Sequence, residues 1–71
     1  MSDTEATTLG KLHAATRRTL EAAGLPDAAL DARILVETLT GTTRTDAVVS
    51  PDRAVDGEAA ARVARAVRRR L

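Results

Sequence analysis

The chain has 71 residues, a formal net charge of +1, no cysteine and no aromatic residue. This length is enough for one small domain. The lack of cysteine excludes disulfides, thiolate metal sites and cysteine nucleophiles, and the lack of aromatics excludes stacking platforms for single-stranded nucleic acid. No apolar run approaches the roughly 20 residues that span a bilayer, and the acidic start "MSDTEATT" is unlike a signal peptide. We therefore expect a cytoplasmic domain without a membrane partner.

The first predicted element is a helix over about residues 7–23. The polar residues before it, 1–7, are expected to be disordered or frayed, so that the helical domain covers residues 8–71. Apolar or small residues recur at spacings of three and four and form one stripe: Leu9, Leu12, Thr16, Leu20 and Ala23. Gly24 is placed as a C-cap, and Pro26 follows as a stop.

A second helix is predicted over about residues 27–40. Its main apolar face consists of Ala28, Ala32, Leu35, Val36 and Leu39. Leu30 and Ile34 form another apolar row, so this helix is expected to be the most buried of the set. Gly41 ends it.

A short third helix and a longer fourth helix complete the pattern. Thr43 and Asp46 have the spacing of a capping box, and the segment closes at Ser50–Pro51. After the loop "SPDRAVDG", Asp56 is a good N-cap for a helix that runs to the end of the chain. Its apolar stripe consists of Ala60, Val63, Ala64, Val67 and Leu71. The predicted fold class is all-α, a small orthogonal or irregular bundle of four to five helices.

Three features invite a catalytic or metal-binding interpretation. Asp27 and Asp31 would share a helix face, but a metal site needs further ligands, and both positions suit the start of a helix, where acids are stabilised. His13 is the only histidine and has no nucleophile or second histidine at a productive spacing, which favours a surface or boundary role. The hydroxyl cluster "TGTTRT" lacks the lysine and glycine spacing of a phosphate loop and is better explained by capping. We predict no catalytic, cofactor-binding or metal-binding residue in this chain.

Charge is divided unevenly along the sequence. Residues 1–58 contain six Lys or Arg against ten Asp or Glu, whereas residues 59–71 contain five Arg and no acid. An arginine-rich helix end can bind phosphates, or it can be a solvated face or a joint to another domain. No second basic helix or base-reading pattern accompanies it, so direct nucleic-acid binding is not favoured.

The order of these segments resembles the N-terminal domain of the bacterial release-factor glutamine methyltransferases, the PrmC/HemK family. The matching stretches are "LEAAGLPDAALDARILVETLTG", "TRTDAVVSPDR" and "ARVARAVRRRL". The resemblance implies an enzyme in which this helical domain precedes a methyltransferase domain that binds S-adenosylmethionine. That enzyme would methylate the glutamine of the Gly-Gly-Gln motif in class 1 peptide chain release factors. The catalytic motif of the family, Asn-Pro-Pro-Tyr, does not occur in this chain, which is therefore expected to be inactive alone.

The role implied for this chain is to recognise and position the release factor. Exposed arginines are the candidate contacts with the release factor or with the C-terminal methyltransferase domain: Arg44, Arg53, Arg68, Arg69 and Arg70. Two alternatives stay open from the residues alone. The chain is a free-standing nucleic-acid-binding bundle that uses its fourth helix, or it is a general protein-interaction module.

Overall fold

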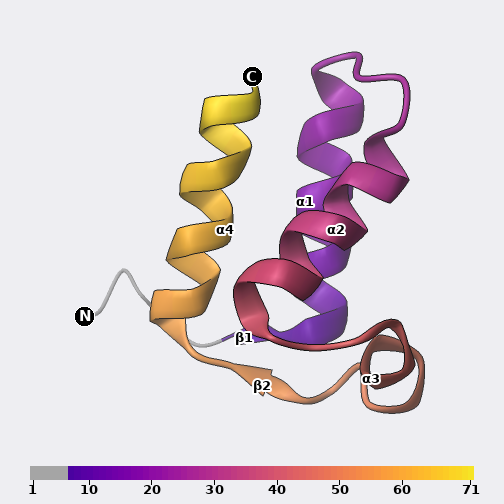
Figure 1. Cartoon of the computed structure of the whole chain (residues 1–71), viewed down its shortest axis with the longest axis vertical. Helices are drawn as coiled ribbons and strands as arrows, with labels where there is room; N and C mark the ends of the chain where they lie inside the picture. The colour runs from indigo at the N-terminus through magenta and orange to yellow at the C-terminus, as the bar shows by residue number, and fades with distance from the viewer. Residues whose placement is uncertain (1–6) are drawn as a thin grey trace.

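A computed structural model describes residues 7–71 as four helices and one minimal sheet (Figure 1). The elements in chain order are β1 (Thr7–Thr8), α1 (Leu9–Ala22), α2 (Ala28–Thr40), α3 (Arg44–Val49), β2 (Ala54–Val55) and α4 (Gly57–Arg70). The predicted all-α class is confirmed, with four helices. The prediction for residues 1–6 lies outside the described residues, and Thr7, the last residue of that predicted segment, pairs with Val55.

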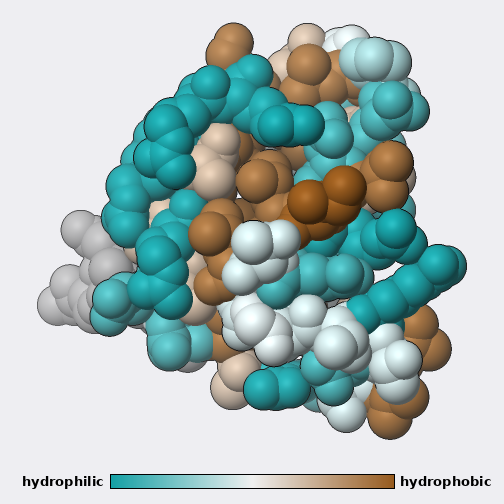
Figure 2. Space-filling model, in the orientation of Figure 1, coloured by the Kyte–Doolittle hydropathy of each residue, from teal (hydrophilic) through white to brown (hydrophobic). Residues whose placement is uncertain are grey.

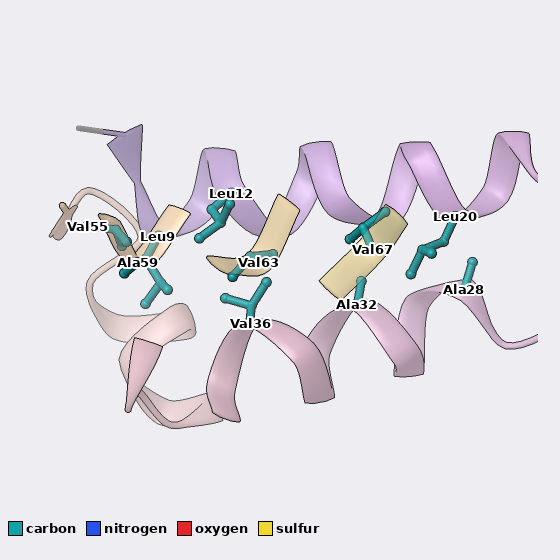
Figure 3. Close-up of a cluster of buried hydrophobic side chains, with 10 residues drawn as sticks. All are labelled: Leu9, Leu12, Leu20, Ala28, Ala32, Val36, Val55, Ala59, Val63 and Val67. Carbon is teal, nitrogen blue, oxygen red and sulfur yellow. The ribbon is translucent and has the colours of Figure 1, made fainter. Parts of the chain in front are cut away.

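Helices α1, α2 and α4 pack against one another around the core, and α3 lies to one side of them (Figure 1). Their facing side chains form one apolar cluster (Figure 3), which consists of Leu9, Leu12, Leu20, Ala28, Ala32, Val36, Val55, Ala59, Val63 and Val67. The chain measures 31 × 29 × 16 Å along its principal axes. Since it is only 16 Å thick, the helices have their outer sides near solvent and the core is thin.

The start of α1 is fixed by the loop that precedes α4. The first backbone N–H groups of a helix have no partner within the helix. Here Leu9 N–H donates to the carbonyl of Arg53 at 2.9 Å, and Gly10 N–H donates to the carbonyl of Pro51 at 2.8 Å. The side chain of Thr8 accepts from Lys11 N–H at 3.3 Å. Together with the antiparallel β1–β2 pair, the bonds to Arg53 and Pro51 connect the start of the described chain to the segment that precedes α4.

Both long helices before α3 end at glycines, as the sequence predicts. Gly24 has φ +81°, and the N–H groups of Gly24 and Leu25 donate back to the carbonyls of Glu21 and Leu20. This is the Schellman arrangement, which requires a left-handed residue. Gly41 ends α2 in the same left-handed region, with φ +69°.

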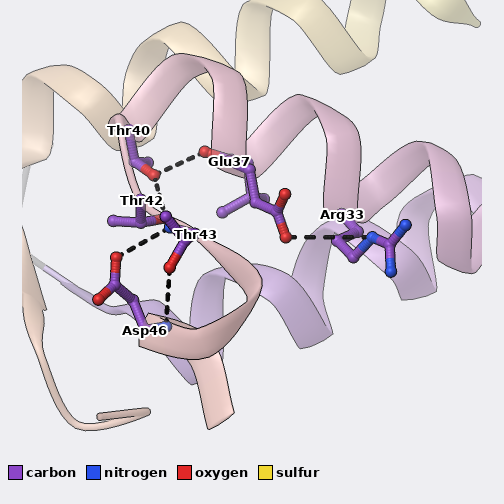
Figure 4. Close-up of polar contacts among 7 residues, drawn as sticks. Arg33, Glu37, Thr40, Thr42, Thr43 and Asp46 are labelled. Atoms are coloured by element: carbon purple, nitrogen blue, oxygen red, sulfur yellow. Dashed lines mark hydrogen bonds and ion pairs between the residues drawn. The ribbon is translucent and has the colours of Figure 1, made fainter. Parts of the chain in front are cut away.

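The predicted capping residues of the last two helices are also confirmed. Thr43 and Asp46 form a reciprocal capping box at the start of α3 (Figure 4): Thr43 N–H donates to the Asp46 carboxylate at 2.8 Å, and Asp46 N–H donates to the Thr43 hydroxyl at 3.1 Å. Thr40 and Thr42 of the same hydroxyl cluster bond to each other at 2.8 Å. Asp56 accepts from Ala59 N–H at 2.8 Å and caps α4. The "TGTTRT" segment therefore has a capping role.

The prediction that α2 is the most buried helix holds by its share of exposed residues, four of 13 against seven of 14 in each of α1 and α4, but its second apolar row is not buried. Its inner face is buried as expected, but Leu30 and Ile34 are 47% and 51% exposed. Figure 2 shows apolar surface on the molecule between the teal, hydrophilic side chains. The reason is thickness: no described element covers the side of α2 that faces away from α1 and α4.

Candidate functional site

Of the two aspartates at the start of α2, only Asp31 makes a side-chain contact in the described residues. Asp27 occupies the N-cap position, but its side chain makes no capping hydrogen bond. Asp31 lies in the first turn, as predicted, and accepts a hydrogen bond from Arg70 of α4 at 2.9 Å. With its side chain only 20% exposed, Asp31 links α2 to the last turn of α4. Within residues 7–71, no cluster of three potential metal ligands occurs.

The three arginines predicted at the end of α4 lie in different environments. Arg70 forms the ion pair with Asp31. Arg68 lines a shallow groove of about 260 Å³ between α1 and α4, whose walls are mainly apolar and which Leu71 closes at one end. Arg69 is exposed. In Figure 2 a hydrophilic band follows α4. The exposed residues of this helix include Arg62 and Arg69.

Arg44 and Arg53 lie near α3, at the opposite end of the molecule from the C-terminus of α4 (Figure 1). Arg53 approaches the Asp46 carboxylate at 3.6 Å, so it braces the capping box of α3. Arg44 is the first residue of α3 and forms none of the ion pairs within residues 7–71. The five predicted arginines therefore divide into two separate groups.

Arg44 contributes to the larger of the described grooves, of about 350 Å³, which lies between α1, α2 and α3. We call it the α1–α2–α3 groove. Small residues form much of its lining: Gly10, Ala14, Ala29, Ala32 and Ala47. Its charged and titratable lining residues are His13, Arg17, Arg33, Glu37 and Arg44. Three arginines from three helices thus line this groove together with one glutamate, Glu37, which lies on the same helix as Arg33.

The ion pairs in this groove are long. Arg17 approaches Glu21 at 3.9 Å, and Arg33 approaches Glu37 at 4.0 Å. The Arg17 and Glu21 side chains are each more than half exposed. Exposed pairs of this kind contribute at most about 1 kcal/mol, and often nothing. The arginines can therefore exchange their partners at little cost.

Two polar atoms beside the groove are buried without a hydrogen-bond partner in the described part of the chain, Nε2 of His13 and Oε2 of Glu37. Burial lowers the pKa of His13 from its ordinary value, and the nearby Glu37 carboxylate opposes that effect. Figure 4 shows the Glu37 side chain turned toward Arg33 on α2. Buried polar groups in folded proteins normally have partners. These two atoms are therefore exceptions among the buried polar side-chain atoms of the described residues, because neither has a hydrogen-bond partner.

The sequence interpretation identified Arg44 but missed the groove around it. A signal was present: Gly10, Ala14 and Arg17 follow one another at spacings of four and three, which places them on one face of a helix. Ala29, Arg33 and Glu37 repeat at spacings of four on the next helix. What the sequence did not contain was the packing that turns these two faces toward each other.

The described residues therefore form a small, mainly helical domain with shallow grooves and exposed arginines. The model of the PrmC N-terminal domain family matches residues 11–71. This chain belongs to the PrmC N-terminal domain family, as the resemblance in the sequence predicted.

A curated relative supports the same assignment. The chain is 41% identical over 66 residues to the release factor glutamine methyltransferase of Agrobacterium fabrum (strain C58 / ATCC 33970). The match covers 93% of this chain but only 22% of that protein, so the chain spans about a fifth of the length of its relative. No solved structure matches the chain. Among the helices of residues 7–71, none is long and apolar enough to cross a membrane.

Proposed function

We propose that this chain is the substrate-positioning N-terminal domain of an S-adenosylmethionine-dependent protein-(glutamine-N5) methyltransferase. The substrates are class 1 peptide chain release factors in the cytoplasm, methylated on the glutamine of their Gly-Gly-Gln motif, in the service of translation termination. The observation that carries this proposal is the family match over residues 11–71, together with the activity named for the Agrobacterium fabrum relative.

The physical role is to hold a protein substrate so that a methyltransferase domain reaches one glutamine. Such positioning replaces a bimolecular encounter by a pre-oriented one and lowers the entropy cost of the reaction without supplying chemistry. Binding of S-adenosylmethionine and methyl transfer belong to the C-terminal methyltransferase domain of the parent enzyme.

The candidate contacts fall on the two surfaces described above. Arg44 and Arg53 flank α3 and are proposed to meet the release factor. Arg68 and Arg69, at the last turn of α4, are proposed to face the methyltransferase domain. Arg70 takes part in that second contact only through the Asp31 pair that holds the end of α4 in place.

The test is a titration of the 71-residue chain with a class 1 release factor, paired with a methyl-transfer assay on the same mixture. We expect saturable binding and no transfer of a labelled methyl group from S-adenosylmethionine. Absence of binding would contradict the positioning role, and turnover by the chain alone would contradict the assignment of chemistry to another domain. A duplex or RNA that binds the chain more tightly than the release factor, with a steep salt dependence, would support the nucleic-acid alternative instead.

A further inference from the structure

The α1–α2–α3 groove has a charge pattern that no part of the described fold requires. Arg17, Arg33 and Arg44 reach it from three different helices, and one carboxylate, Glu37, lies among them. None of the three arginines bonds across the groove to another helix within residues 7–71; the two that are paired bond to the next turn of their own helix. The positive charge is therefore directed at the groove without bracing its walls.

The first requirement on an occupant is negative charge. Guanidinium groups bind carboxylates through short, charge-assisted hydrogen bonds, which are stronger than the 3.9 and 4.0 Å pairs that two of these arginines now make. Arg44 has no such pair to give up within the described residues. A ligand carboxylate at Arg44 consequently gains an interaction without breaking one.

The second requirement is a hydrogen-bond donor. Within residues 7–71 the Glu37 carboxylate accepts no hydrogen bond, although its Oε2 lies 4.0 Å from Arg33; Oε2 is buried, the side chain as a whole is 26% exposed, and a carboxylate oxygen only accepts. Inorganic phosphate would meet repulsion at Glu37 and offers fewer donors than a peptide. A peptide offers both groups at once, backbone N–H donors and side-chain carboxylates.

The third requirement concerns shape. The alanines of the lining leave the backbone of α1 and α2 close to the groove, and Val48 adds an exposed apolar edge. A volume of about 350 Å³ is at the lower end of the range for small-molecule sites, which admits a few residues of extended chain rather than a helix. The sequence contains no aromatic residue on which a nucleobase could stack.

We propose that the α1–α2–α3 groove binds an acidic, extended segment of a partner protein, with Arg44 as the principal carboxylate contact and Glu37 as an acceptor for its backbone. The proposal rests on the proposed function only for the identity of the protein that carries the segment, which would then be the release factor. The groove itself is assigned from its charge, the partly exposed Glu37 carboxylate and its size.

The test uses the 71-residue chain and a short capped peptide that alternates glutamate and glycine, with a matched peptide in which glutamine replaces glutamate. Binding is followed by the amide NMR shifts of the chain during titration. We expect saturable shifts that include Gly10, Ala14 and Ala47, and affinity at least about tenfold weaker for the glutamine peptide.

Two charge-reversal variants separate a specific site from general attraction. Arg44→Glu should lower the affinity for the acidic peptide by about tenfold. Arg65→Glu, on the outer side of α4, should change that affinity by less than about twofold. Both variants alter the net charge equally. Arg44→Glu should also fold, because an acid at the first position of α3 is favoured by the helix dipole.

Equal weakening in both variants would overturn the proposal, as would shifts that avoid the groove. Tighter binding of inorganic phosphate or of an RNA oligonucleotide at the same residues would indicate that the groove binds phosphate groups rather than a peptide. That result would also overturn the proposal. A failure here leaves the release-factor titration of the unaltered chain as a separate test of the proposed function, so the two failures are distinguishable.

Discussion

Leu20 and Leu30 offer a matched test of how thin the core is, because both are leucines inside helices and differ in burial. Leu20 is fully buried, whereas Leu30 is 47% exposed. In Figure 3, Leu20 lies at one end of the cluster, close to the small side chain of Ala28. So small a neighbour is poorly able to fill the cavity that Leu20→Ala would leave.

The expected cost follows from these environments. Truncation of a fully buried leucine typically destabilises by about 2–5 kcal/mol. A domain of this length has a total unfolding free energy of about 4–10 kcal/mol. Leu20→Ala should therefore remove about a fifth of the stability or more. Leu30→Ala should cost less than about 1 kcal/mol, because half of its surface is already in water and alanine favours the helix.

The assay is urea unfolding followed by far-ultraviolet circular dichroism, since the chain has no aromatic residue to report by fluorescence. Both variants should keep the slope of the unfolding free energy against urea, and only the midpoint should move. The reasoning is refuted if the two variants differ by less than about 1 kcal/mol. Such a result would mean that Leu30 on the outer face of α2 is as well packed as Leu20 in the core.

Three further predictions concern polar groups. Arg70→Gln should lose about 0.2–1 kcal/mol of stability through its pair with Asp31, and the loss should shrink in high salt, while Arg69→Gln stays neutral in the same urea titration. The pKa of His13 is lowered in the folded chain, so the unfolded chain binds a proton more readily, and the stability should fall as the pH drops below about 6.5. His13→Gln should reduce the difference in urea midpoint between pH 5 and pH 7.5. If that difference is unchanged, the pH dependence comes from other groups. Thr43→Ala removes one half of the capping box and should weaken α3 by about 0.5–2 kcal/mol, seen as faster amide hydrogen exchange confined to that helix, whereas exchange unchanged from the parent would contradict the capping role.

The helices were predictable because their signals are local. The spacing of apolar residues located α1, α2 and α4. The caps located the end of α1, at Gly24, and the starts of α3 and α4, at Thr43 and Asp56, to within a residue or two. The β1–β2 pair was not predicted, since two residues on each side give no alternating pattern and the partners lie far apart in sequence. Burial of Val55 depends entirely on that pairing.

The exposure of Leu30 and Ile34 could not be predicted from periodicity, which identifies apolar rows but not the number of layers that cover them. The groove around Arg44 could not be predicted for a related reason. Arg44 was recognised as an exposed cation, but its grouping with Arg17 and Arg33 depends on how three helices pack. Local sequence patterns specify helix faces, whereas a groove is a property of their arrangement.

The central claim is that this chain serves as the N-terminal domain of a release-factor glutamine methyltransferase. The most direct measurement grafts it onto the Agrobacterium fabrum relative in place of the 66 matched residues and compares the chimera with the intact enzyme and with a version lacking that segment. We predict that the chimera methylates its release factor with a KM close to that of the intact enzyme, and that the shortened version has a much higher KM. A folded chimera whose KM equals that of the shortened version would contradict the claim.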